Sequence, residues 1–140
     1  MWKVWKSNIK GNDLVYKIMI KSINKTSNNI EINAFVDTGN SLKDVINNLD
    51  IFIVQNTNKF NYHMAIKNEK VEVCLNTVNA NCKLDGYIFN NILIFKNNKK
   101  IVNLNRAVIV FVDRNLSTSN KYNSLISYDT YIEKLQGVSL

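Results

Sequence analysis

The sequence has no proline and only four glycines, at positions 11, 39, 86 and 137. Tight turns must therefore depend on Asn, which tolerates the left-handed backbone region better than most residues. No apolar run approaches the length of a membrane-spanning helix. The 140 residues are therefore predicted to form a soluble unit.

Cysteine and histidine are also scarce. Cys74 and Cys82 are the only cysteines, and without a signal sequence they do not predict a secreted disulfide framework. They could face each other on a hairpin, but reduced thiols are expected. His63 is the only histidine and has no Cys or carboxylate at ligand spacing. Neither a metal site nor a catalytic triad is predicted, and no phosphate-binding loop or other cofactor site is found.

Basic residues outnumber acidic ones, 18 to 11, which gives a formal net charge of +7. The lysines are scattered along the chain rather than clustered, a pattern typical of a solubilising surface. Nucleic acid is therefore not predicted as a partner. A basic nucleic-acid-binding β-barrel is kept as a third hypothesis that rests on net charge alone, and steeply salt-dependent DNA binding would support it.

Period-two alternation dominates the first three quarters of the chain. Apolar residues occupy every second position in 14–20 and again in 30–36, the pattern of half-buried strands, and 24–29 joins the two as a hairpin. The run Ala107–Val112 is wholly apolar, which predicts a strand buried on both faces. Further strands are predicted at Ile51–Val54, Val71–Leu75 and Tyr87–Phe95.

The last part of the chain changes to a helical period, because apolar residues recur at three- and four-residue spacing from Tyr122 to Leu135. One helix is predicted over Lys121–Leu135, with a cap among residues 117–120 and Gly137 just after its end. No linker or repeat divides the chain. We therefore predict a single domain, residues 1–140, that is mostly β, a closed barrel with one C-terminal helix.

Chemistry is indicated at Asp37, where an apolar strand ends in an acid followed by Thr38 and Gly39. Two carboxylates held close together cannot both ionise, so one keeps its proton as an acid while the other acts as a base. Such a site needs Asp at the end of a rigid strand and a Gly that lets the backbone approach it. The alternative without catalysis is that Asp37, Thr38 and Gly39 form an ordinary turn at the end of a strand, because Asp and Gly are common in turns.

This Asp-Thr-Gly after an apolar strand resembles the active-site signature of the aspartic proteases. Retroviral members carry the signature once per chain and build the dyad from two identical chains. The resemblance implies a retropepsin-like barrel and a homodimer that places one catalytic Asp37 from each subunit at the two-fold axis. Thr38, Gly39 and Asn40 would form the active-site loop.

A longer run, Asp37 to Asp44, resembles the Asp-Thr-Gly-Asn-x-Leu-x-Asp element of the sporulation sigma-E factor processing peptidase. Residues 122–126 resemble the Tyr-x-x-Leu-Ile/Leu element near that family's C-terminus. The resemblance implies that the chain corresponds to the protease half of a membrane protein, attached to the cell membrane through an N-terminal domain. It also implies an inactive pro-sigma factor as substrate and a regulatory signalling protein as partner.

Some positions depart from these patterns. Val45 stands where the family usually has Pro, and the best candidate for a flap, Thr77–Gly86, has Gly86 as its only glycine. These departures favour a second hypothesis, a protease-like binding module that has lost its chemistry. The apolar ends, Trp2–Trp5 and Val138–Leu140, are candidates for a shared sheet in a dimer.

Two further charged residues carry open alternatives. Asp44 could supply a second carboxylate, although an acid at that spacing more often caps a turn or pairs with a lysine. Arg114 could form an ion pair that braces the loop over the active site, or it could be a plain surface arginine.

Overall fold

The computed structural model describes residues 14–21, 29–39, 43–44, 48–76 and 81–137. Side chains are not described for residues 43, 44, 75, 76, 81 and 82. In chain order the elements are β1 (Val15–Ile20), β2 (Ile30–Asp37), β3 (Lys43–Asp44), β4 (Leu49–Gln55), η2 (Tyr62–Ala65), β5 (Lys70–Asn76), β6 (Asn81–Lys96), β7 (Lys99–Val112), β8 (Ser124–Ser127), α2 (Tyr128–Thr130) and η3 (Tyr131–Leu135). Strands predominate, as the sequence predicted.

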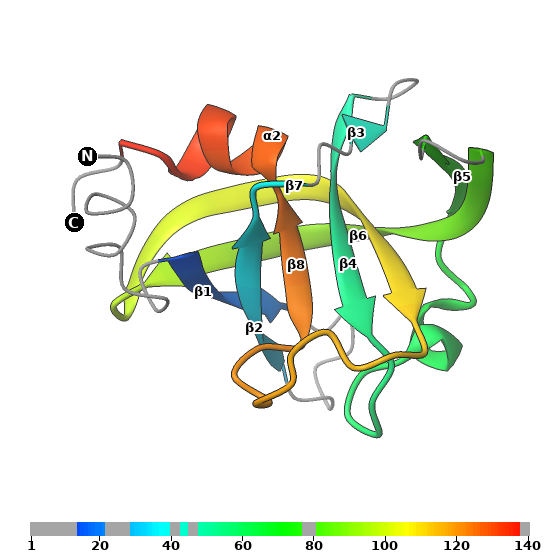
Figure 1. Cartoon of the computed structure of the whole chain (residues 1–140), viewed down its shortest axis with the longest axis horizontal. Coiled ribbons are helices and arrows are strands. Elements are labelled where there is room, and N and C mark those ends of the chain that lie inside the picture. The colour runs from blue at the N-terminus through cyan, green and yellow to red at the C-terminus, as the bar shows by residue number, and fades with distance from the viewer. Residues whose placement is uncertain (1–13, 22–28, 40–42, 45–47, 77–80, 138–140) are drawn as a thin grey trace.

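Within the described residues the sheet closes on itself. Strand β1 pairs with β2 on one side and with β6 on the other, so β1, β2, β8, β4, β7 and β6 form a ring. Strand β5 extends the sheet from β6 outside this ring. The predicted closed β-barrel with one short C-terminal helix is therefore confirmed (Figure 1). In the described part of the chain, no helix is both long and apolar enough to cross a membrane.

The first hairpin follows the predicted alternation. Tyr16, Ile18 and Ile20 are buried on β1, and Ile32, Ala34 and Val36 are buried on β2. Lys17 and Glu31 point the other way and form an exposed ion pair at 3.8 Å. The two strands are antiparallel, with Ile18 opposite Ile32. Period two thus placed every second side chain in the barrel interior.

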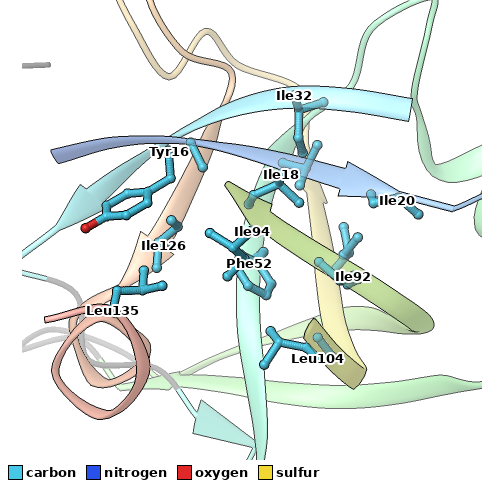
Figure 2. Packing of buried hydrophobic residues seen from close by; sticks show 14 of the residues in the cluster. Tyr16, Ile18, Ile20, Ile32, Phe52, Ile92, Ile94, Leu104, Ile126 and Leu135 are labelled. Carbon is cyan, nitrogen blue, oxygen red and sulfur yellow. The ribbon is translucent and has the colours of Figure 1, made fainter. Parts of the chain in front are cut away.

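The core has two layers because β4 and β7 are buried on both faces. One cluster fills the barrel interior, where Figure 2 shows Phe52, Ile92 and Ile94 packed among side chains from β1, β2 and β8. The second cluster lies outside the ring, where Ile51, Ile53 and Val108 meet Val73 of β5. Residues 107–110 are fully buried, as expected for this apolar run, whereas Phe111 and Val112 at its end are half-buried.

Asparagine provides the left-handed turns, as the lack of glycine predicted. Every described non-glycine residue with positive φ is an asparagine. Asn97 and Asn98, with φ of 51° and 63°, join the long strands β6 and β7 in a two-residue turn. Positive φ at both central residues is the geometry of the tight hairpin turns that match strand twist.

The predicted helix over Lys121–Leu135 is wrong in its first half. Residues 124–127 form strand β8, which lies between β2 and β4, and the helix runs only from Tyr128 to Leu135. Ser127 caps it by accepting from the Thr130 backbone N–H. Gly137 follows the end with φ of +80°, as expected. Pairing with two strands distant in sequence outweighs a helical period in so short a segment.

Gly86 has a packing role on β6. A Cβ at this position would lie 2.5 Å from Cγ1 of Val108 and 3.1 Å from Cγ2 of Val73. We expect Gly86→Ala to lower the free energy of unfolding by about 1–3 kcal/mol, because the valines would have to shift. Urea denaturation measures this. Lys83→Ala, an exposed change on the same strand, is the control and should stay within about 0.5 kcal/mol; equal stability of the two variants would contradict the packing role.

Tyr16 makes stability sensitive to alkaline pH. Its ring is buried at the edge of the core near Leu135 (Figure 2), and burial, with a smaller contribution from Tyr131, raises the pKa of Tyr16 above its usual 10.0. A raised pKa in the folded state means that the unfolded chain loses this proton first. The stabilisation is therefore complete below pH 10 and is lost as pH rises through the folded-state pKa.

We expect Tyr16→Phe to remove this part of the alkaline loss of stability. The measurement is the free energy of unfolding of both proteins in urea between pH 8 and pH 11. The wild-type curve should fall more steeply above pH 10 than that of the variant, whereas parallel curves would show that Tyr16 does not contribute.

Candidate functional site

The candidate catalytic residue, Asp37, is the last residue of β2. Thr38 and Gly39 form the turn that follows, and the Gly39 N–H donates a hydrogen bond of 3.1 Å to Oδ1 of Asp37. The Asp37 side chain is half-buried, while Thr38 and Gly39 are exposed. The sequence prediction that the backbone of this turn donates to the carboxylate is met by this hydrogen bond.

The strand that carries Asp37 is firmly held. Ala34 and Val36 are completely buried and alternate with outward-facing positions, so the strand enters the turn in a single register. Asp37 is therefore attached to the barrel wall rather than to a mobile loop, which is what precise placement of a reacting group requires.

Gly39 places no side chain beside the carboxylate. A Cβ at this position would meet Oδ1 of Asp37 at 3.5 Å, an ordinary contact distance, and the backbone of Gly39 is not left-handed. Nothing within the described chain therefore demands glycine here.

The two sequence segments that carried the family resemblance lie side by side. Strand β8 runs parallel to β2, with Ser127 in register with Asp37 and Leu125 with Phe35. Tyr122, just before β8, stacks on Phe35 with ring centroids 4.9 Å apart. The C-terminal element therefore forms the strand that flanks the Asp-Thr-Gly strand.

Sequence reasoning missed the buried carboxylate of Asp50 at the same end of the barrel. Asp50 is 2% exposed at the start of β4; its Oδ1 accepts from the Thr130 hydroxyl at 2.8 Å, and its Oδ2 pairs with Lys134 Nζ. The Thr130 hydroxyl in turn lies 3.1 Å from Oγ of Ser127. The sequence did contain a signal for this site, since Asp50 directly precedes the apolar run 51–54. An acid that is buried with such a run must find charged or hydrogen-bonding partners.

The other sequence candidates are placed as follows. Asn40 lies outside the described residues, as do 1–13 and 138–140, the apolar ends. Asp44 pairs through its backbone with Leu49, and its side chain is not described. In the flap candidate, residues 81–86 belong to β6 of the β5–β6 hairpin, and residues 77–80 are not described.

Arg114 lies at the other end of the barrel from Asp37. Strand β4 is antiparallel to β8 and parallel to β7, so β7 ends at the opposite end of the barrel from Asp37. The segment after β7 packs there, where the Gln55 side chain donates to Asn115 and accepts from the Leu116 N–H. Arg114 is an exposed residue of that segment.

The cysteines and the histidine stand apart from this site. Cys74 is a free, exposed thiol opposite Lys83, while Cys82 is in register with Leu75, so the two cysteines are not direct cross-strand partners. His63 lies on η2 and its ring contacts Tyr62. Among the described residues, no group of three His, Cys, Asp or Glu side chains is placed to hold a metal ion.

Comparison with known proteins agrees with the resemblance in the Asp37 segment. A search of curated proteins found no match. The family model Peptidase_U4, described as sporulation factor SpoIIGA, matches residues 1–76, more than half of the chain. This range contains β1, β2, the Asp-Thr-Gly turn and β4. The chain therefore belongs to the sporulation factor SpoIIGA family of peptidases.

Proposed function

We propose that this chain is one subunit of a homodimeric aspartic endopeptidase in which Asp37 of each subunit forms the catalytic dyad. The observation that carries the proposal is the placement of Asp37 at the end of a buried strand, with the Gly39 N–H donating to its carboxylate. Gly39 places no side chain beside the carboxylate that a second subunit and a substrate would have to reach.

The second carboxylate is supplied by symmetry. Asp50, the buried acid at this end of the barrel, has both carboxylate oxygens engaged, by Thr130 and by Lys134. A two-fold axis beside the turn would bring a second Asp37 to the first. Two equivalent carboxylates at short range share one proton, because both cannot be charged.

The reaction then follows from the shared proton. The ionised Asp37 takes a proton from water as its oxygen attacks the peptide carbonyl carbon, while the protonated Asp37 donates to the carbonyl oxygen. The tetrahedral intermediate collapses as one Asp37 gives the proton taken from water to the amide nitrogen, the other Asp37 takes a proton from a hydroxyl of the gem-diol, and the C–N bond breaks. The products are a carboxylic acid and an amine, and the dyad regains its single proton.

The resemblance to the sigma-E factor processing peptidase supplies the proposed substrate, an inactive pro-sigma factor that loses its N-terminal pro-sequence. It also supplies two further proposals, attachment to the cell membrane through an N-terminal domain and control by a signalling protein. We also propose that the β5–β6 hairpin is the flap of this protease.

The test is co-expression of this chain, joined to its membrane domain, with a pro-sigma factor. We expect a shortened sigma factor, whose new N-terminus mass spectrometry identifies, and a dimer in sedimentation equilibrium of the purified protein. A stable dimer that leaves the substrate intact, even with the signalling protein present, would favour the binding-module alternative. A strictly monomeric active enzyme would contradict the shared dyad.

A further inference from the structure

A buried polar cluster lies next to the strand end that carries Asp37. It consists of Asp50 from β4, Ser127 from the end of β8, and Thr130 and Lys134 from the C-terminal helix. Asp50 and Ser127 are each 2% exposed and Thr130 is completely buried. Burying so much polarity is costly unless every group has a partner, so the cluster calls for an explanation.

The interactions of the cluster form a continuous chain. Lys134 pairs with one oxygen of Asp50, and the Thr130 hydroxyl donates to the other oxygen at 2.8 Å. The Thr130 hydroxyl also lies 3.1 Å from Oγ of Ser127, and that Oγ accepts from the Thr130 N–H at 3.3 Å. Because a hydroxyl has one proton, the Ser127 hydroxyl donates to Thr130 when Thr130 donates to Asp50. Asp50 thereby orients both hydroxyls.

This chain of interactions ends at Ser127, the residue beside Asp37 in the sheet. Ser127 is the residue in register with Asp37 in the parallel pair β2–β8, and it is the last residue of β8. Figure 1 shows the ends of β2 and β8, the start of β4 and the helix together at one end of the barrel. Strand β8 has only four residues and Ser127 is its last, so the contacts of the Ser127 side chain add to the pairing of this strand with β2 and β4.

We propose that Asp50, Thr130 and Lys134 are positioning residues that hold Ser127 and, through its backbone, set the position of Asp37. Reacting groups must be held to within about 0.5 Å, and a displacement of about 1 Å can cost 10²-fold in rate. The cluster meets this need without contacting the carboxylate of Asp37. The effect on catalysis rests on the proposed function, whereas the effect on the backbone at Asp37 does not.

The test compares Thr130→Val, which removes the hydroxyl at nearly constant shape, with Thr130→Ser, which keeps it. Thr57→Val is the matched control, because the Thr57 hydroxyl accepts from the Phe60 N–H at 3.1 Å after the far end of β4. All variants are assayed below their unfolding transitions. We expect Thr130→Val to lower kcat at least about tenfold with KM within about twofold, and Thr130→Ser to restore most of it.

A second readout needs no substrate. We expect amide hydrogen exchange at residues 37–39, measured by NMR, to be at least about fivefold faster in Thr130→Val than in Thr130→Ser or Thr57→Val. Unchanged exchange in Thr130→Val would overturn the proposal whatever the activity. If the wild-type protein cleaves nothing but exchange is still faster in Thr130→Val, the positioning role is upheld and the result counts against the peptidase proposal instead. An unchanged kcat despite faster exchange would overturn the catalytic consequence.

Discussion

Asp37→Asn is expected to lower the rate of pro-sigma factor processing by about 10²–10⁴-fold, the usual contribution of a general acid–base group. Asparagine keeps an oxygen that can accept from the Gly39 N–H, so the turn should persist. The free energy of unfolding should therefore change by no more than about 1 kcal/mol. Processing is followed as the appearance of shortened sigma factor, and urea denaturation measures stability.

A mixing experiment separates a shared dyad from a site built within one chain. When wild-type and Asp37→Asn subunits are expressed equally and pair at random, about one quarter of the dimers carry two intact Asp37 residues. Activity should then fall to about half of that from the same amount of wild-type subunit alone, because half of the intact subunits pair with a variant. Activity unchanged by excess variant subunit would contradict the shared dyad, and wild-type rates from the variant alone would exclude Asp37 as the catalytic residue.

Lys134→Met is expected to lower the free energy of unfolding by about 3 kcal/mol. The substitution keeps most of the apolar stem and removes the charge that pairs with Asp50, whose side chain is only 2% exposed. Breaking a buried pair by removing one partner costs about 3–5 kcal/mol, because the remaining charge is uncompensated. The lower end of that range applies, because the Lys134 side chain is 34% exposed and water can reach the vacated space.

The matched comparison is Lys17→Met, which breaks the exposed pair with Glu31 and should cost less than about 1 kcal/mol. The double variant Asp50→Asn with Lys134→Met should recover most of the loss, because it leaves no unpaired charge and Asn can still accept from Thr130. Urea denaturation of the four proteins gives the comparison. Equal losses in Lys134→Met and Lys17→Met would mean that the buried pair does not stabilise the helix against the barrel.

Local chemistry alone predicted a large part of this molecule. The alternation in 14–20 and 30–36 placed the right side chains in the barrel, because strand geometry sends successive residues to opposite faces whatever lies around them. The scarcity of glycine correctly predicted asparagine turns such as Asn97–Asn98. The Asp-Thr-Gly turn was predicted at a strand end for the same reason, since turn preference is a property of a few adjacent residues.

The sequence by itself therefore determined the paired strands β1 and β2, the asparagine turns and the position of Asp37 at a strand end. Only the tertiary structure decided that residues 124–127 form a strand, that Arg114 lies at the far end of the barrel, and that Asp50 meets Thr130 and Lys134. Backbone sterics and side-chain period act between near neighbours and can be recognised in a short segment. Strand pairing and buried polar contacts join distant residues, and which residues meet depends on how the whole barrel closes.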